Sequence, residues 1–136
     1  MEREYLPPPP GVFHHPNFTR VVTVSGPMKL VLIAGQTAGD EATNRCIAPG
    51  NMRAQYIRVM ENLDKQLRAA KASWDDVIYR RTFVLDMDAY MAVLRDPTTP
   101  KFGNPAKPSP GTLVGVTRLT DPEFLIEIDL LAAIPA

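Results

Sequence analysis

The stretch Asn51-Met-Arg-Ala-Gln-Tyr-Ile-Arg-Val-Met-Glu-Asn-Leu-Asp-Lys-Gln-Leu-Arg-Ala-Ala-Lys71 decides the fold of this chain. Its apolar residues recur at spacings of three and four, which predicts one helix with a continuous apolar stripe. Asn51 is a suitable N-cap, and most of the charged residues fall on the opposite face. A stripe of this kind packs against a core. It consists of Tyr56, Val59, Met60, Leu63, Leu67 and Ala70.

Strand-like segments lie on both sides of this helix. Upstream, Phe18–Val24 and Lys29–Ala34 are joined by Ser25-Gly26-Pro27, whose turn chemistry predicts a β-hairpin. Downstream, further strands are expected over residues 77–86, 112–119 and 124–133, with a second helix over residues 87–94. This order of elements predicts an α+β fold, a sheet with two helices on one face.

The segment Phe124–Leu131 carries apolar residues toward both faces of the predicted sheet. Ile126 and Ile128 alternate with Leu125 and Glu127, and Leu131 follows on the second face. Two helices can cover only one face, and the other would expose more apolar surface than a monomer usually does. We therefore expect copies of the chain to associate.

The N-terminal segment has a different character. Four consecutive prolines, Pro7–Pro10, fix an extended backbone, so residues 1–16 are predicted to form a polyproline-like arm on the surface. The remaining residues, 17–136, are enough for one domain with its own core.

Composition excludes several classes of function. The chain has 15 Lys and Arg residues and 15 Asp and Glu residues, whereas proteins that bind nucleic acid carry a basic excess or stripe. No apolar run is long enough for a signal peptide or a membrane span. We therefore expect a cytoplasmic protein with neither a nucleic-acid nor a membrane partner.

The sequence also gives little support for a metal site or for nucleophilic catalysis. The chain has no phosphate-binding glycine loop, no dinucleotide fingerprint and no His-Glu-x-x-His motif. His14 and His15 are adjacent in an extended segment, so their side chains diverge instead of converging on a metal. The only cysteine, Cys46, cannot form an intramolecular disulfide and reads as an incidental thiol. We expect no metal and no cofactor.

Glu127 is the most informative polar residue, because it lies inside an otherwise apolar strand. A carboxylate in such a place needs a partner or solvent. Three interpretations remain open: an outward residue at an edge, a structural ion pair with Arg80 or Arg118, or a general base that holds a water molecule.

A second informative stretch is the proline-rich Pro105–Val116. A rigid loop that enters a strand presents backbone amides and one cation, Lys107, in a defined position. It suits either an anion site or a stiff connector.

Taken together, an ordered set of segments resembles the Rid family, also called YjgF or RidA and formerly endoribonuclease L-PSP. The set covers roughly residues 18–133. It comprises Leu30-Val-Leu-Ile-Ala-Gly-Gln36, the helix and strand start over residues 62–77, Thr82-Phe-Val-Leu-Asp-Met-Asp-Ala-Tyr90, Leu113-Val-Gly-Val116 and Leu125-Ile-Glu-Ile-Asp129.

The resemblance implies a chorismate-mutase-like α+β domain that assembles as a homotrimeric barrel with pockets between subunits. It also implies hydrolysis of small 2-imino or enamino acids to 2-oxo acids and ammonia, without metal or cofactor. By this resemblance Glu127 corresponds to the glutamate that positions the water. The residues implied to contact the small-molecule substrate are Phe18, Ala34, Gly35, Gln36, Gly111, Thr112 and Leu113.

Two departures from the family pattern concern the substrate carboxylate. The family's clamp arginine is replaced by Gly111, and the nearest upstream cation, Lys107, lacks the planar fork that grips a carboxylate. Ala34 stands where the family has a serine. We therefore expect a Rid-like hydrolase or deaminase of altered substrate specificity. The alternative is a trimeric small-molecule binding or sensing module that lacks catalysis.

Overall fold

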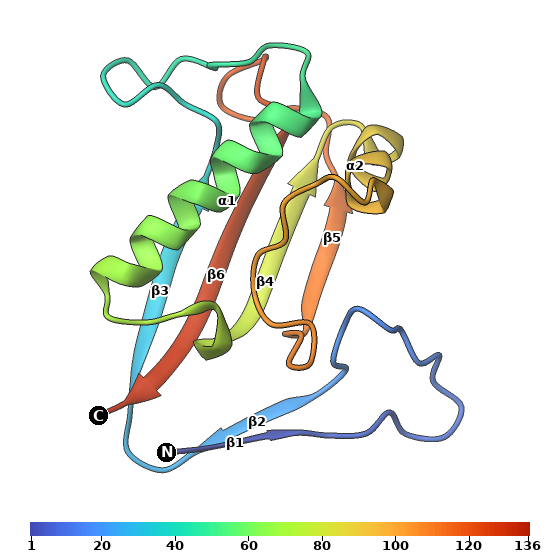
Figure 1. Ribbon diagram of the computed structural model, residues 1–136, viewed down its shortest axis with the longest axis vertical. Helices are drawn as coiled ribbons and strands as arrows, with labels where there is room; N and C mark the ends of the chain where they lie inside the picture. Colours follow the sequence, from blue (N-terminus) through green and yellow to red (C-terminus); the bar gives the residue numbers. More distant parts are fainter.

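A computed structural model describes residues 1–136, and its elements follow the predicted order with one additional strand (Figure 1). The strands are β1 (Glu2–Tyr5), β2 (Val22–Ser25), β3 (Met28–Gln36), β4 (Val77–Val84), β5 (Gly111–Gly115) and β6 (Ile126–Pro135). The helices are α1 (Met52–Ala69), the short η1 (Trp74–Asp76) and α2 (Met87–Arg95).

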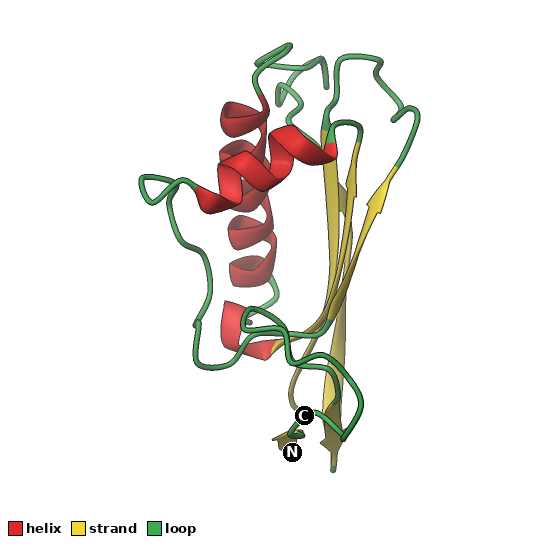
Figure 2. Cartoon of the chain, turned by 90° about the vertical axis from the view of Figure 1, so that its right-hand side faces the viewer, coloured by secondary structure: helices red, strands yellow, loops and turns green.

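Four strands form a mixed sheet in the order β3-β6-β4-β5. Strand β6 is antiparallel to both of its neighbours, while β4 and β5 run parallel. Helices α1 and α2 pack on the same face of this sheet and leave the other face open (Figure 2). The predicted α+β architecture with two helices on one face is confirmed. None of the helices combines the length and apolarity needed to cross a bilayer.

The core lies between α1 and the central strands. Five of the six residues of the predicted stripe are buried, with Val59, Leu63 and Leu67 fully inaccessible to solvent, whereas Ala70 is half-buried at the C-cap. Opposite them, Ile126 and Ile128 of β6 are also fully buried. Alternate residues of β6 therefore anchor the helix layer, because side chains along a strand point to opposite faces in turn.

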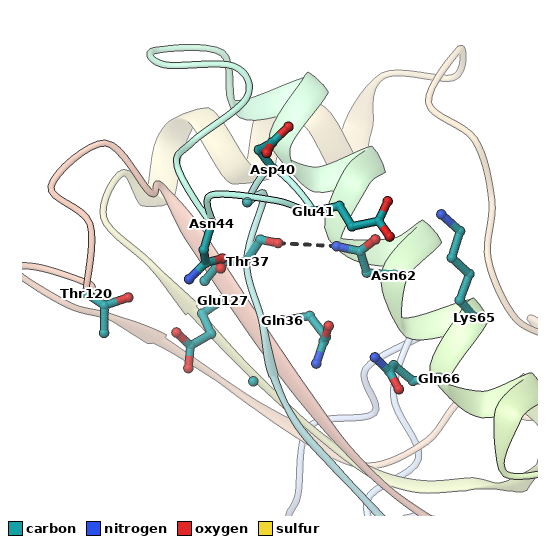
Figure 3. Close-up of a pocket in the computed structure, with 12 residues that line it drawn as sticks. Gln36, Thr37, Asp40, Glu41, Asn44, Asn62, Lys65, Gln66, Thr120 and Glu127 are labelled. Carbon is teal, nitrogen blue, oxygen red and sulfur yellow. Dashed lines mark hydrogen bonds between the residues drawn. The ribbon is translucent and has the colours of Figure 1, made fainter.

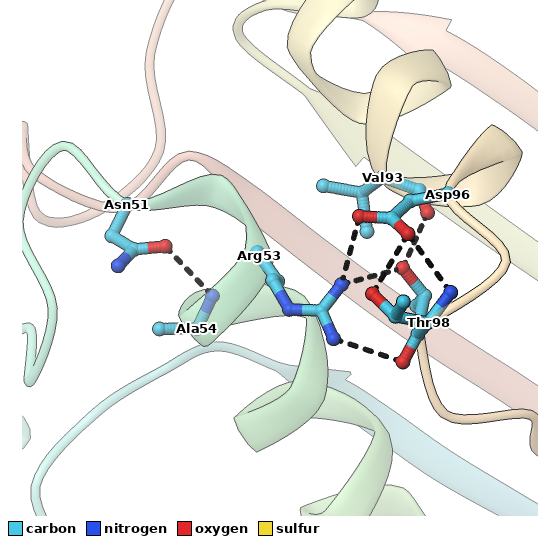
Figure 4. A network of polar contacts seen from close by, with 7 residues as sticks. Asn51, Arg53, Ala54, Val93, Asp96 and Thr98 are labelled. Atoms are coloured by element: carbon cyan, nitrogen blue, oxygen red, sulfur yellow. Dashed lines mark hydrogen bonds and ion pairs between the residues drawn. The ribbon is translucent and has the colours of Figure 1, made fainter.

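Polar contacts fix the start of α1 (Figure 4). Asn51 is the N-cap, as predicted, and its side chain accepts a hydrogen bond from the Ala54 backbone at 2.9 Å. Arg53 then links α1 to the segment that follows α2, donating to Thr99 Oγ1 at 2.9 Å and lying 3.4 Å from an oxygen of Asp96. These contacts hold the two helices together at the rim of the sheet.

The predicted surface arm is wrong for residues 2–5, which form β1 and pair antiparallel with β2. These residues precede the first proline of the run, so their backbone N–H groups remain free to join a ladder. Arg3 anchors the strand, because its Nη2 lies 2.6 Å from Oδ1 of Asp76 and also donates to the carbonyl of Ala133. The division into an arm of residues 1–16 and a domain of residues 17–136 stays a prediction.

The predicted hairpin between residues 18–24 and 29–34 is also wrong. Strand β2 pairs with β1, whereas β3 pairs with β6, nearly a hundred residues later in the chain. Gly26, between the two strands, has φ +87°, a left-handed backbone conformation that glycine adopts without steric cost. The four prolines that follow β1 masked its strand character in the sequence. The turn residues between β2 and β3 therefore predicted the wrong strand pairing.

Candidate functional site

A polar cavity of about 740 Å³ lies where β3 ends, beside β6 and the polar face of α1 (Figure 3). None of its lining residues is hydrophobic, which is unusual for a ligand pocket and suits a small polar molecule. The lining comprises Gly35, Gln36, Thr37, Gly39, Asp40, Glu41, Asn44, Asn62, Lys65, Gln66, Thr120 and Glu127.

Glu127 lies on the open face of the sheet, half-buried, opposite Phe83 of β4. Its carboxylate rests against the backbone of Gly35. A Cβ at residue 35 would overlap Oε2 of Glu127 and come within 2.8 Å of its Cδ. Glycine at this position therefore allows the carboxylate to lie over β3 at the cavity.

The carboxylate of Glu127 forms no ion pair and no hydrogen bond within the chain. The ion pair with Arg80 or Arg118 that sequence left open is thus wrong. Arg80 lies on the helix-covered side of β4, where it donates to Thr82 Oγ1 at 3.2 Å and to the Tyr90 hydroxyl at 3.1 Å. Glu127 keeps its lone pairs available for a ligand or a water molecule.

An irregularity in β3 shapes the cavity wall. The β3–β6 register shifts between Ile33 and Gln36, which then pairs with Ile128. A bulge of this kind bends a strand and redirects its side chains. The Gln36 side chain donates to the carbonyl of Ala34 at 2.9 Å and is held at the cavity, next to Gly35.

A buried glutamine fixes the segment that leads into β6. Gln55 of α1 is fully buried and donates from Nε2 to the carbonyls of Ala48 at 2.9 Å and Glu123 at 3.0 Å. Its Oε1 accepts from the backbone N–H of Leu125 at 2.8 Å. With all these contacts made, Gln55 fixes the segment that leads directly to Glu127.

The cavity carries more negative than positive charge. Asp40, Glu41 and Glu127 contribute carboxylates, and Lys65 is the only lysine or arginine in the lining. Hydrogen bonds from the backbone of Thr43 and Ala42 lower the pKa of Asp40 below its ordinary value, so it is ionised at neutral pH. The site therefore favours a neutral or cationic ligand over an anion.

The other residues implied by the family resemblance lie elsewhere in a single copy of the chain. Ala34 is exposed next to Gly35 but does not line the cavity, and Lys107 is exposed in its loop and lines neither described cavity. Phe18 lines a second cavity. In β5, the hydroxyl of Thr112 is hydrogen bonded to Tyr79, and Leu113 packs against the core.

The backbone around Gly111, where the family resemblance implies an arginine, leaves no room for a side chain. A Cβ there would come within 2.7 Å of the carbonyl oxygen of Arg80, its register partner in β4. Real Cβ atoms do not approach backbone this closely, so an arginine would require the strand pair to shift.

Sequence analysis missed the contribution of α1 to the cavity. Asn62, Lys65 and Gln66 line it from the polar face of the helix, and Asn62 Nδ2 lies 3.4 Å from the carbonyl of Thr37 (Figure 3). On sequence these residues belong to an ordinary solvent-facing surface, and no motif marks them.

Cys46 does not belong to the chemistry of the site. Burial raises the pKa of its thiol, and its Sγ lies 3.4 Å from the carbonyl oxygen of Glu123. A protonated thiol is a poor nucleophile. The structure contains no group of three or more His, Cys, Asp or Glu side chains arranged to hold a metal ion.

Comparisons with known proteins agree with this fold. The family model for endoribonuclease L-PSP matches residues 15–134. A RutC family protein from Synechocystis sp. is 31% identical over 102 residues, which is 75% of this chain and 76% of that protein.

Solved structures give the same result. A protein of unknown function of the conserved Rid family from Yersinia pestis has a TM-score of 0.76 and 27% identity, covering 98% of this chain and 100% of its own. A YjgF/YER057c/UK114 family member from Mycobacterium tuberculosis has a TM-score of 0.55 and 25% identity, covering 85% of this chain and 86% of its own. The chain therefore belongs to the endoribonuclease L-PSP family, the Rid or YjgF family that its sequence resembles.

Proposed function

We propose that this protein hydrolyses a small imine or enamine, with Glu127 as the general base. The observation that carries the proposal is the free carboxylate of Glu127, held over Gly35 at the edge of a polar cavity without any partner in the chain. A carboxylate without a partner in the chain keeps its lone pairs for a water molecule or a substrate.

The reaction follows from a water molecule bound by Glu127. The carboxylate accepts a proton as the water oxygen attacks the imine carbon, which becomes tetrahedral and carries an amine. Glu127 returns the proton to nitrogen and then accepts the proton of the new hydroxyl group as the carbon–nitrogen bond breaks, which leaves a carbonyl compound and ammonia. Asp40 and Glu41 favour the positive charge of a protonated imine, which makes its carbon more electrophilic.

Substrate specificity should differ from that of relatives that bind an amino-acid carboxylate. Gly111 offers no cation and has no space for one, and the lining of the cavity is acidic. We therefore propose an imine or enamine that has no carboxylate next to the reacting carbon.

Self-association is part of the proposal, as a homotrimer by family resemblance. The open face of the sheet exposes Leu32 by 78% and Leu30 by 53%, with Tyr79 and Val114 also exposed. Contiguous apolar side chains of this size on a sheet face are typical of an interface. A neighbouring copy on this face would also remove water from the surroundings of Glu127, which lies on the same side of β6.

Ammonia release tests the chemistry. Imines generated in situ, 2-iminobutanoate and a counterpart without the carboxylate, are compared as substrates, and we expect faster turnover of the second. Glu127→Gln should lower kcat about a hundredfold or more, because the amide cannot accept the proton of the water. Glu61→Gln is the control, an exposed carboxylate on α1 outside the cavity.

Two results would contradict these claims. Full activity of Glu127→Gln would show that Glu127 is not the general base. Turnover of 2-iminobutanoate equal to that of a relative with the arginine would refute altered specificity.

The crowding around Gly111, which leaves no room for a larger side chain, also favours a second candidate function. This candidate is a binding module without catalysis. A relative that has lost its carboxylate clamp could retain the cavity to sense a metabolite. Binding of an imine or its carbonyl product, with no ammonia released across the panel, would support this function over hydrolysis.

A further inference from the structure

The cavity at Glu127 extends beyond this carboxylate to the polar face of α1. Glu127 lies on one side of the end of β3, and Lys65 and Gln66 of α1 lie on the other (Figure 3). The cavity volume of about 740 Å³ falls in the range of roughly 300–1,000 Å³ that is typical of pockets for drug-sized ligands. An imine of only a few carbon atoms would therefore leave the α1 side of the cavity unoccupied.

The two sides of this cavity differ in charge. Glu127 lies on the β6 side, and the loop after β3 contributes the carboxylates of Asp40 and Glu41. The α1 side contributes the ammonium group of Lys65, the one lysine or arginine of the lining. A ligand that spans the cavity is therefore recognised best when it places a cationic group near the carboxylates and an anionic group at α1.

The charge of Lys65 is available to a ligand. Glu41 extends toward α1 (Figure 3), yet Lys65 forms no ion pair with it or with any other carboxylate of the chain. Arg68, on the same helix but outside the lining, is by contrast paired with Asp64, with Nη2 at 2.8 Å from Oδ2. Lys65 thus keeps all three of its N–H donors for an anionic group.

Two amide side chains lie on the same face of α1 as Lys65. Asn62 and Gln66 are one helical turn apart, and both line the cavity. Asn62 Nδ2 lies 3.4 Å from the carbonyl oxygen of Thr37, a contact that holds this side chain at the end of β3. Gln66 is exposed and can donate from its amide to a ligand. Donors from three side chains are therefore gathered on the α1 side of the cavity.

We propose that the α1 side of the cavity is a subsite for a carboxylate that lies several bonds from the reacting carbon. Lys65 binds this carboxylate by charge, and Asn62 and Gln66 donate hydrogen bonds to it. The inference rests on the proposed function and names its substrate class, a protonated imine with a carboxylate at its far end. Such a zwitterion has no net charge, which suits a lining with more carboxylates than cations.

Binding is measured on the full-length protein by ¹H–¹⁵N NMR titration with stable ketones that resemble the carbonyl product. In 5-oxohexanoate the carboxylate is at the far end, in its isomer 2-oxohexanoate it is next to the ketone, and 2-hexanone has none. We expect 5-oxohexanoate to shift the backbone amides of residues 62–66. Its affinity, determined from these amides, should exceed that of each of the other two ketones about fivefold or more.

Variants of α1 identify the group that binds the carboxylate. Lys65→Gln should weaken binding of 5-oxohexanoate about three- to fivefold, because an exposed ion pair contributes modestly, and should leave binding of 2-hexanone unchanged. Lys65→Arg, which keeps the charge, should retain most of the affinity. The matched control is Arg68→Gln, which removes a cation of the same helix outside the lining and should change neither affinity.

Three results would overturn the subsite, with the amide shifts of β6 reporting that each variant keeps the fold. The first is equal affinity for the two oxohexanoates at residues 62–66. The second is wild-type affinity for 5-oxohexanoate in Lys65→Gln. The third is an equal loss of affinity in Arg68→Gln, which would show that the net charge of α1 attracts the ligand without a contact to Lys65.

This proposal and the proposed hydrolysis fail separately. Binding of 5-oxohexanoate that depends on Lys65, without ammonia release from any imine, rejects only the hydrolysis. Ammonia release, without a preference for 5-oxohexanoate over its isomer, rejects only the subsite.

Discussion

The two faces of the sheet differ although they share the same strands. On the face covered by α1 and α2, Ile126 and Ile128 of β6 are completely buried in a single copy of the chain. On the open face, Glu127 and Asp129 alternate with them and remain partly accessible, while Leu32 of β3 is 78% exposed. Every second side chain of β6 therefore packs in the core and stabilises the domain, while the side chains between them point to the open face.

Two carboxylates on the open face also differ in whether they have a partner in the chain. Asp129 on the open face is bound by Arg81, with Nε at 3.0 Å and Nη2 at 2.6 Å from its oxygens. Glu127, two residues earlier on the same face, has no such partner. The comparison indicates that the open face holds one satisfied carboxylate and one that is free to act, and that the free one lies at the cavity.

The largest expected effect comes from a charge on the open face. Leu32→Glu should dissociate the proposed assembly, because it would bring copies of an unpaired carboxylate into an apolar interface at a cost of several kcal/mol. Light scattering at micromolar concentration should then give the single-chain mass of 15.0 kDa, while the fold is retained.

The control for this variant is Ile47→Glu, which places the same charge on another exposed apolar side chain, 43% accessible, in a loop outside the sheet. It should leave the assembly intact. If the wild-type protein already had the single-chain mass, the open face would not be an interface between copies.

A core truncation on the covered face should have the next largest effect. Ile128→Ala removes a fully buried side chain beneath α1 and should lower the free energy of unfolding by about 2–5 kcal/mol. Leu131→Ala on the half-buried open face should cost only about 1 kcal/mol. Urea unfolding of both variants in the Leu32→Glu background excludes contributions from assembly. Equal losses for the two variants would show that the faces do not differ in this way.

The smallest effect concerns the rim of the covered face, where Asp96 joins the segment after α2 to Arg53 (Figure 4). Hydrogen bonds from the backbone and side chain of Thr98 hold the pKa of Asp96 below its ordinary value of 3.8. Because the folded state lowers this pKa, the stabilisation is present above the ordinary value and is lost as pH falls through the folded-state pKa.

Asp96→Asn should therefore lower Tm slightly at pH 7 and by less at pH 2, as measured by circular dichroism. Glu61→Gln, at an exposed helix position, serves as the comparison. The same Tm deficit at both pH values would show that the ionised carboxylate of Asp96 is not the cause.

Sequence predicted some parts of the site better than others. The strand around Glu127 identified an unusual carboxylate, and family resemblance added Gly35 and Gln36 beside it. Neither could show why residue 35 is glycine, which depends on contact between β3 and β6 across most of the chain. Gln55 was equally hidden, because a glutamine in a polar-looking helix position reads as solvent-exposed until its buried partners are known.

The sequence by itself determined the helix α1, the order of the elements and the α+β class, because these follow from periodicity along a continuous segment. Only the tertiary structure decided that β1 pairs with β2, that Arg80 turns away from Glu127, and that residue 111 has no room for a side chain. These features depend on contacts between distant segments. Their geometry is set by packing in three dimensions, and the local pattern of residue types carries no record of it.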